Sequence, residues 1–175
     1  QEASRKLGYG VKTTMDIAQR LYQNGYITYM RTDSVNLSDL AINTARTFIE
    51  KEFGAEYSMP NGRRFKTKQA SAQEAHEAIR PAGDHFRTPA EVSSLLSKQQ
   101  LALYDLIWKR TLASQMTDAL GFTATIRVLT GISVEGERHD VISSASGTVI
   151  THPGFRQAYQ EGRDKGPGQE EDGGV

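Results

Sequence analysis

The spacing of apolar residues changes near Asp118, and this change constrains the fold more than any other feature of the sequence. Before it, apolar residues recur every three or four positions, which is typical of amphipathic helices. From Gly121 to Leu129 the sequence alternates with a period of two, which is typical of a β-strand. The helical stripes are Val11, Met15, Ala18, Leu21 and Tyr22; Ile42, Ala45, Phe48, Ile49 and Phe53; and Leu101, Tyr104, Trp108 and Leu112. The sequence therefore predicts an α+β chain.

Residues that start or stop helices support this division. Ser38 and Thr88-Pro89 suit helix starts, because a hydroxyl can cap the first turn and proline fits its first position. Gly25 and Gly54 stand where the first two helices should end. Two further helical turns are predicted from Gln73 to Ile79, before Pro81 stops them.

The remaining segments are predicted to be extended or irregular. Aromatic and β-branched residues at 26–30 favour an extended segment. Val141-Ile142 and Thr148-Val149-Ile150 predict two further strands, with a turn at Ser146-Gly147. Gly, Glu and Asp dominate after Glu161, which favours a flexible linker. We expect a helical domain over 1–118, the start of a β-rich domain over 119–160 and an acidic, Gly-rich linker over 161–175.

Composition and charge set broader limits. The chain has 175 residues and no cysteine, so disulfides and thiolate metal sites are excluded within it. No apolar run approaches the ~20 residues of a membrane span, and no signal segment opens the chain. The first residue is Gln1 and not methionine, so we expect an excised piece of a longer protein.

The formal net charge of zero gives no overall attraction to nucleic acid. The charges are unevenly spread, however: residues 63–68 form a basic cluster, and acidic residues outnumber basic ones from Glu161 to Asp172. A basic face can meet phosphates in a neutral chain. The alternative is a solvated basic loop, and charge alone favours that alternative.

The segment Gly25-Tyr-Ile-Thr-Tyr-Met-Arg-Thr-Asp-Ser34 is the first candidate for chemistry. In an extended segment Tyr29 and Arg31 share a face, and Thr28 and Met30 share the other. A phenol is a weak nucleophile, and a nearby guanidinium favours its ionised form and can hold two phosphate oxygens. Asp33 could orient that guanidinium or a neighbour. On this pattern alone, a packed tyrosine beside a solvated arginine remains the alternative.

The second candidate is Gln73-Glu-Ala-His-Glu-Ala-Ile-Arg-Pro81. His76-Glu77 begins like the zinc-protease pattern H-E-x-x-H, but Arg80 occupies the position of the second histidine, so the metal interpretation fails. On a helix His76 and Arg80 would share a face and could grip a phosphate. A surface helix whose charges face water is the alternative. The sequence contains neither a G-x-x-x-x-G-K-[ST] phosphate loop nor a G-x-S-x-G nucleophile motif.

Both segments resemble signatures of one family, the type IA DNA topoisomerases. Residues 25–34 are similar to its active-site signature and residues 73–81 to its second signature, in the same order along the chain. Two shorter segments, Ala18 to Tyr22 and Leu106-Ile107-Trp108, are also similar to sequences typical of this family. Met30 stands where the topoisomerase III branch typically has proline, so the resemblance is to bacterial topoisomerase I. It is strong over residues 1–118 and looser to about Tyr159.

The resemblance implies roles for individual residues. Tyr29 would attack a single-strand phosphodiester and become linked to the 5′ phosphate, while Arg31 would stabilise the phosphate in the transition state. His76 would contact DNA near the scissile site, with Asp33 supporting it and Arg80 as a weaker candidate. The remaining residues implied to touch the DNA strand are Gln19 and Arg20.

The resemblance also implies the surroundings of the site. The activity would be ATP-independent relaxation of negatively supercoiled DNA through a phosphotyrosine intermediate. Mg²⁺ would be bound by a separate metal-binding domain outside this chain, so the fragment alone should be inactive. The fold would be a helix-turn-helix-like tyrosine domain followed by the first strands of a β-rich hinge domain. The expected partners are single-stranded DNA and the missing metal-binding and gate domains, in the bacterial cytoplasm at the nucleoid and with no membrane.

Two alternatives belong to other classes. A non-catalytic single-stranded nucleic-acid-binding module would use Tyr29 to stack on a base and would form no covalent adduct. A structural or interaction domain would show no salt-dependent DNA affinity.

Overall fold

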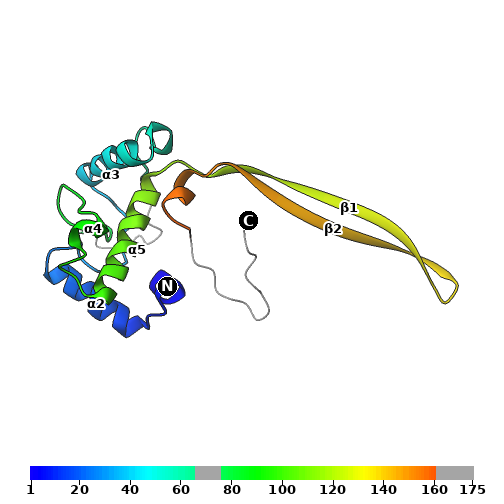
Figure 1. Cartoon of the computed structure of the whole chain (residues 1–175), viewed down its shortest axis with the longest axis horizontal. Coiled ribbons are helices and arrows are strands. Elements are labelled where there is room, and N and C mark those ends of the chain that lie inside the picture. Colours follow the sequence, from blue (N-terminus) through cyan, green and yellow to red (C-terminus); the bar gives the residue numbers. More distant parts are fainter. Residues whose placement is uncertain (66–75, 161–175) are drawn as a thin grey trace. The chain divides into compact units, whose positions relative to one another are not determined.

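The computed structural model describes residues 1–65 and 76–160, which fall into two compact units. One unit contains the chain up to Thr117 and the segment from Phe155, and the other runs from Asp118 to Gly154. The helices are α1 (Glu2–Leu7), α2 (Val11–Gln23), α3 (Asp39–Glu52), α4 (Pro89–Val92) and α5 (Lys98–Gln115), with 3-10 turns η1 (Ala55–Tyr57) and η2 (Gly154–Gln157), and the strands are β1 (Leu120–Val134) and β2 (Glu137–His152) (Figure 1). The predicted α+β class is confirmed. The predicted division into three domains stays a prediction, and residues 155–160 pack with the helices.

Helix α5 is the centre of the helical unit, and α1, α2, α3 and α4 all contact it. Three residues of its predicted apolar stripe, Tyr104, Trp108 and Leu112, are buried, and the fourth, Leu101, is half-buried. They meet Leu21 of α2 and Ile49 of α3 in a single core cluster. This core fixes the C-terminal half of α2, and therefore the start of the segment that carries Tyr29.

The predicted helix at α2 is confirmed, but its predicted buried face is partly wrong. Leu21 and Ala18 are buried as predicted, whereas Val11, Met15 and Tyr22 are 82%, 39% and 41% exposed. Ile17, which the predicted stripe omitted, completes the buried face instead. The apolar row on the outer face of α2 is therefore not part of the core.

The residues that the sequence predicted at the starts and ends of the helices are found there. The Ser38 hydroxyl accepts a hydrogen bond from the Ala41 amide, which caps α3. Thr88 and Glu91 form a reciprocal capping box at the start of α4, with Pro89 in the first turn. Gly25 and Gly54, after α2 and α3, have φ values of 71° and 108°, in the region that favours glycine.

The strands form one antiparallel two-stranded ribbon, with pairing from Leu120↔His152 to Val134↔Glu137. The two-residue turn is Glu135-Gly136, and both residues have positive φ, as tight hairpin turns require. The predicted turn at Ser146-Gly147 is wrong, because these residues pair with Thr125 and Ala124 inside the ladder. Small residues were interpreted as a break, but backbone pairing with β1 keeps them extended.

The predicted helical turns at 73–79 are not observed where the structure can be compared. Residues 73–75 lie outside the described residues, and residues 76–79 are not helical. Instead, the Ala78 amide donates to the Asn36 carbonyl at 2.7 Å, and the Thr28 amide donates to the Arg80 carbonyl at 2.9 Å. The predicted extended segment at 26–30 forms no regular strand, but Ile27 makes an isolated antiparallel bridge to Pro81. Long-range backbone pairing thus overrides the local helical preference.

None of the helices in the described ranges 1–65 and 76–160 is long and apolar enough to cross a membrane.

We predict that the helical unit loses stability at alkaline pH through Tyr104. Burial raises the pKa of the Tyr104 phenol to about 12, and its hydroxyl donates to the Arg87 carbonyl at 2.6 Å. The unfolded phenol titrates near pH 10. The folded pKa is the higher one, so the contribution is complete below about pH 10 and is lost as pH rises through 12.

The measurement is urea unfolding of the wild type and of Tyr104→Phe between pH 8 and 12. The stability advantage of the wild type should shrink as pH rises above 10, by up to about 3 kcal/mol. Tyr159, whose pKa burial also raises to about 12, is present in both proteins and cancels in the comparison. A difference that does not change with pH would contradict the prediction.

Candidate active site

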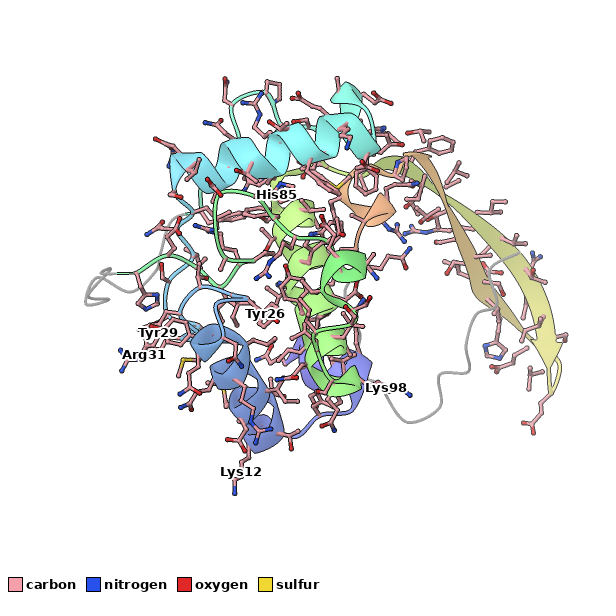
Figure 2. All side chains as sticks on the ribbon, turned by 60° about the vertical axis from the view of Figure 1, so that its left-hand side comes forward. Lys12, Tyr26, Tyr29, Arg31, His85 and Lys98 are labelled. Atoms are coloured by element: carbon pink, nitrogen blue, oxygen red, sulfur yellow. The ribbon has the colours of Figure 1, made fainter. Side chains whose placement is uncertain are left out.

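Tyr29 and Arg31 lie beyond the C-terminal end of α2, on the same side of the chain as the sequence predicted. The Arg31 guanidinium carbon is 5.8 Å from the centre of the Tyr29 ring. Figure 2 shows both side chains at the surface, at the opposite end of α2 from Lys12. Tyr29 is half-buried and Arg31 is exposed. Within the described part of the chain, the Tyr29 hydroxyl makes no hydrogen bond and Arg31 no salt bridge, so both groups can meet a ligand.

Two aromatic rings from distant parts of the sequence flank Tyr29. The centre of the Tyr22 ring is 5.2 Å away at an interplanar angle of 70°, and that of the His76 ring is 5.2 Å away at 82°. Such edge-to-face arrangements are the ones that aromatic quadrupoles favour. The Tyr29 ring is therefore held by α2 and by the segment at residue 76.

His76 is itself held by two hydrogen bonds. Its Nε2 lies 2.9 Å from an Asp33 carboxylate oxygen, and its Nδ1 lies 2.8 Å from the Glu77 carbonyl oxygen. Together the two contacts fix the orientation of the His76 ring beside Tyr29. The structure thus brings together four of the predicted site residues: Tyr29, Arg31, Asp33 and His76.

Arg80 faces the interior and not the surface beside Tyr29. It is only 7% exposed. Its Nη2 and Nε donate to one Glu77 carboxylate oxygen at 2.6 and 3.1 Å, and its Nη1 donates to the Pro81 and Gly83 carbonyls at 2.8 and 2.9 Å. These contacts occupy the guanidinium and favour a supporting role.

Glu77 connects Arg80 to the start of α3. One carboxylate oxygen accepts from the Ser38 amide at 2.6 Å, and the other accepts from Arg80. Burial alone would raise the pKa of Glu77, but the hydrogen bonds from Ser38 and Arg80 outweigh burial and hold this pKa below its usual value. Glu77 is therefore an ionised bridge between the two segments.

Thr28 is a site residue that the sequence analysis did not single out. Its hydroxyl donates to the Ala78 carbonyl at 2.7 Å and accepts from the Arg80 amide at 2.9 Å. The alternation in the sequence placed Thr28 on the face opposite Tyr29. A threonine on that face could have been predicted to point inward and bond to another segment. Tyr22 and Glu77 were missed as well, because their contacts depend on tertiary structure.

Gln19 and Arg20 are exposed on α2. Neither takes part in the hydrogen bonds or ring contacts that surround Tyr29 in the described residues. Their predicted contact with DNA stays a prediction.

The residues near Tyr29 do not fit a divalent metal ion. Divalent cations such as Mg²⁺ need several oxygen ligands, usually carboxylates. The described carboxylate beside the site, Asp33, is paired with His76. Across residues 1–65 and 76–160, no group of three or more His, Cys, Asp or Glu side chains could hold a metal ion.

Comparison with known proteins identifies the family. Residues 1–172 match the family described as DNA topoisomerase. The chain belongs to the DNA topoisomerase family. The resemblance drawn from the two signatures is therefore confirmed.

Two bacterial relatives show the extent of this topoisomerase match. The chain is 56% identical over 164 residues to DNA topoisomerase 1 of Streptomyces coelicolor, covering 94% of the chain and 17% of that protein. It is 54% identical over 172 residues to DNA topoisomerase 1 of Mycolicibacterium smegmatis, covering 98% of the chain and 18% of that protein. The chain thus spans less than a fifth of these relatives.

A solved topoisomerase shares the fold. The full-length topoisomerase I of Thermotoga maritima superposes with a TM-score of 0.66 at 34% identity, over 97% of this chain and 27% of that one.

Proposed function

We propose that the protein containing this chain breaks and rejoins one DNA strand through Tyr29, and so relaxes negatively supercoiled DNA without ATP. The observation that carries the proposal is the placement of the Tyr29 phenol. It is unbonded within the described residues, beside the exposed guanidinium of Arg31 and the ring of His76. Family membership supports the same activity.

In the cleavage step, the Tyr29 oxygen attacks the phosphorus of a phosphodiester. The phenol loses its proton, a bond forms between Tyr29 and the 5′ phosphate of the downstream piece, and the bond to the upstream 3′ oxygen breaks. That oxygen takes up a proton and leaves as a 3′ hydroxyl. Arg31 is placed to stabilise the negative charge on the phosphate oxygens during this transfer.

Rejoining is the same step in reverse. The 3′ hydroxyl attacks the phosphotyrosine and the Tyr29 oxygen leaves. Each step exchanges one phosphate ester for another, so no external energy source is required. A second DNA segment passes through the break between the two steps.

The remaining residues act on the DNA or on Tyr29. His76, which Asp33 holds, contacts the DNA near the scissile phosphate, and Arg80 supports this arrangement from the interior. Gln19 and Arg20, exposed on α2, touch the DNA strand. Mg²⁺ belongs to another domain of the parent protein, and its absence from this chain makes the isolated chain inactive. The parent acts in the bacterial cytoplasm at the nucleoid.

The test is covalent adduct formation by the full-length parent. A single-stranded oligonucleotide labelled at its 3′ end should leave label on the protein after denaturation, because Tyr29 retains the downstream piece. The same oligonucleotide labelled at its 5′ end is the matched control and should leave none. The isolated chain should give no adduct with either.

The other outcomes discriminate among the functions. Label from the 5′ end would mean that the linkage has the opposite polarity. The absence of an adduct from either label, with DNA still bound, would favour a non-catalytic single-stranded nucleic-acid-binding module in which Tyr29 stacks on a base.

A further inference from the structure

Tyr22 is an aromatic residue on the outer face of α2 that the core does not use. It is 41% exposed, whereas its neighbour Leu21 is fully buried and holds this turn of the helix in the core. Its ring and the Tyr29 ring form a T-shaped pair, with their centres 5.2 Å apart. Tyr22 is thus a rigidly mounted side chain whose described ring contact is with Tyr29.

The backbone around Tyr29 gives that side chain less support. Residues 28–31 belong to no helix or regular strand, and they follow Gly25, whose φ is 71°. The Thr28 amide donates a hydrogen bond to the Arg80 carbonyl, but Tyr29 is the residue after this bond. The direction of its ring is therefore set by the side chains beside it, the rings of Tyr22 and His76 and the guanidinium of Arg31.

We propose that Tyr22 is a positioning residue for Tyr29. Resting on the function proposed above, this inference assigns Tyr22 the task of holding the Tyr29 ring so that its oxygen approaches the scissile phosphorus in line. His76 confines the ring as well and is itself fixed by Asp33 and the Glu77 carbonyl. Tyr22 acts through its ring and not through its hydroxyl, because that hydroxyl makes no hydrogen bond within the described residues.

Positioning has a kinetic signature that differs from binding. Phosphoryl transfer requires the attacking and leaving oxygens to be in line, and a small misplacement of a reacting group lowers the rate steeply. Cleavage and rejoining use the same line of approach in opposite directions. Loss of Tyr22 should therefore slow both steps together, without changing DNA affinity or the final fraction of adduct.

The experiment uses the full-length protein and a 3′-labelled single-stranded oligonucleotide in single-turnover reactions. Tyr22→Ala should lower the rate constants of cleavage and rejoining by about tenfold or more, with Kd and the final adduct fraction unchanged. Tyr22→Phe keeps the ring and should restore the wild-type rate. Met15→Ala is the matched control, because Met15 is 39% exposed on the same outer face of α2, and it should leave the rate unchanged.

Four results would overturn the proposal. The first is cleavage by Tyr22→Ala at the wild-type rate. The second is a loss of DNA affinity in Tyr22→Ala by the same factor as the loss of rate, which would make Tyr22 a DNA contact. The third is a Tyr22→Phe variant as slow as Tyr22→Ala, which would make the hydroxyl the active part. A lower final adduct fraction at an unchanged rate would reveal partial unfolding. If the wild type forms no adduct at all, the proposed function fails first.

Discussion

Tyr29→Phe in the full-length protein is expected to abolish the covalent adduct with single-stranded DNA. The substitution removes one oxygen atom, the atom to which the phosphate is proposed to bond. It keeps the ring, so the contacts with Tyr22 and His76 at 5.2 Å can persist. DNA affinity should remain close to that of the wild type, because Arg31 and His76 are unchanged. The measurement is 3′ label retained on denatured protein, alongside Kd for the same oligonucleotide.

The control for this substitution is Tyr22→Phe. It makes the same chemical change on the ring next to Tyr29, and the adduct should form. An adduct that persists in Tyr29→Phe would place the nucleophile elsewhere and remove Tyr29 from the site. If both variants lose the adduct together with DNA affinity, the two rings serve binding and the covalent step is not assigned to Tyr29.

Three of the helices and the first strand were predictable because their signals are local. Periodicity located α2, α3 and α5, and the hydroxyl caps at Ser38 and Thr88 have the geometry that the sequence indicated. The ribbon turn was missed because Glu135-Gly136 was not recognised as a turn, while the small residues Ser146-Gly147 were interpreted as one. Whether a residue pairs in a β-ladder depends on the partner strand, and the pattern within one strand carries no information about that partner.

The candidate site likewise contains some contacts that a local pattern predicts and others that depend on tertiary structure. Tyr29 and Arg31 are two residues apart, so a local alternation was enough to put them on one side. Tyr22 contacts Tyr29 because α2 ends and the chain turns back, and Thr28 meets Arg80 across 52 positions. The sequence pattern assigned Tyr22 to the core and placed Arg80 on a helix with His76. Neither assignment is correct, because the packing of α2 and the pairing of residues 26–28 with 80–82 determine both positions.

Arg80 shows how much of this site depends on a partly buried ion pair. Its guanidinium satisfies the Glu77 carboxylate and the carbonyls of Pro81 and Gly83. Through Glu77 it stabilises the link to Ser38 at the start of α3. The Arg80 backbone also bonds to Thr28, one residue before Tyr29. The arginine therefore holds together the two segments that form the site without facing it.

Arg80→Ala is expected to lower the free energy of unfolding of the helical unit by about 3–5 kcal/mol, because removing one partner leaves a partly buried charge uncompensated. The measurement is urea unfolding at pH 7. Arg64→Ala is the matched control: its ion pair with Asp39 is exposed, with side chains 64% and 77% accessible, so the cost should stay below about 1 kcal/mol. Equal costs for the two variants would contradict the prediction.

The pH dependence supplies a second check on Arg80→Ala. The folded pKa of Glu77 lies below the reference value of 4.5, so its contribution is present above that value and is lost as pH falls through the folded pKa. The stability difference between wild type and Arg80→Ala should therefore shrink as pH falls below 4.5. A difference that stays constant at low pH would show that packing of the arginine stem, and not its charge, holds the two segments together. The Arg80→Met variant, which keeps most of that stem, would then be as stable as the wild type.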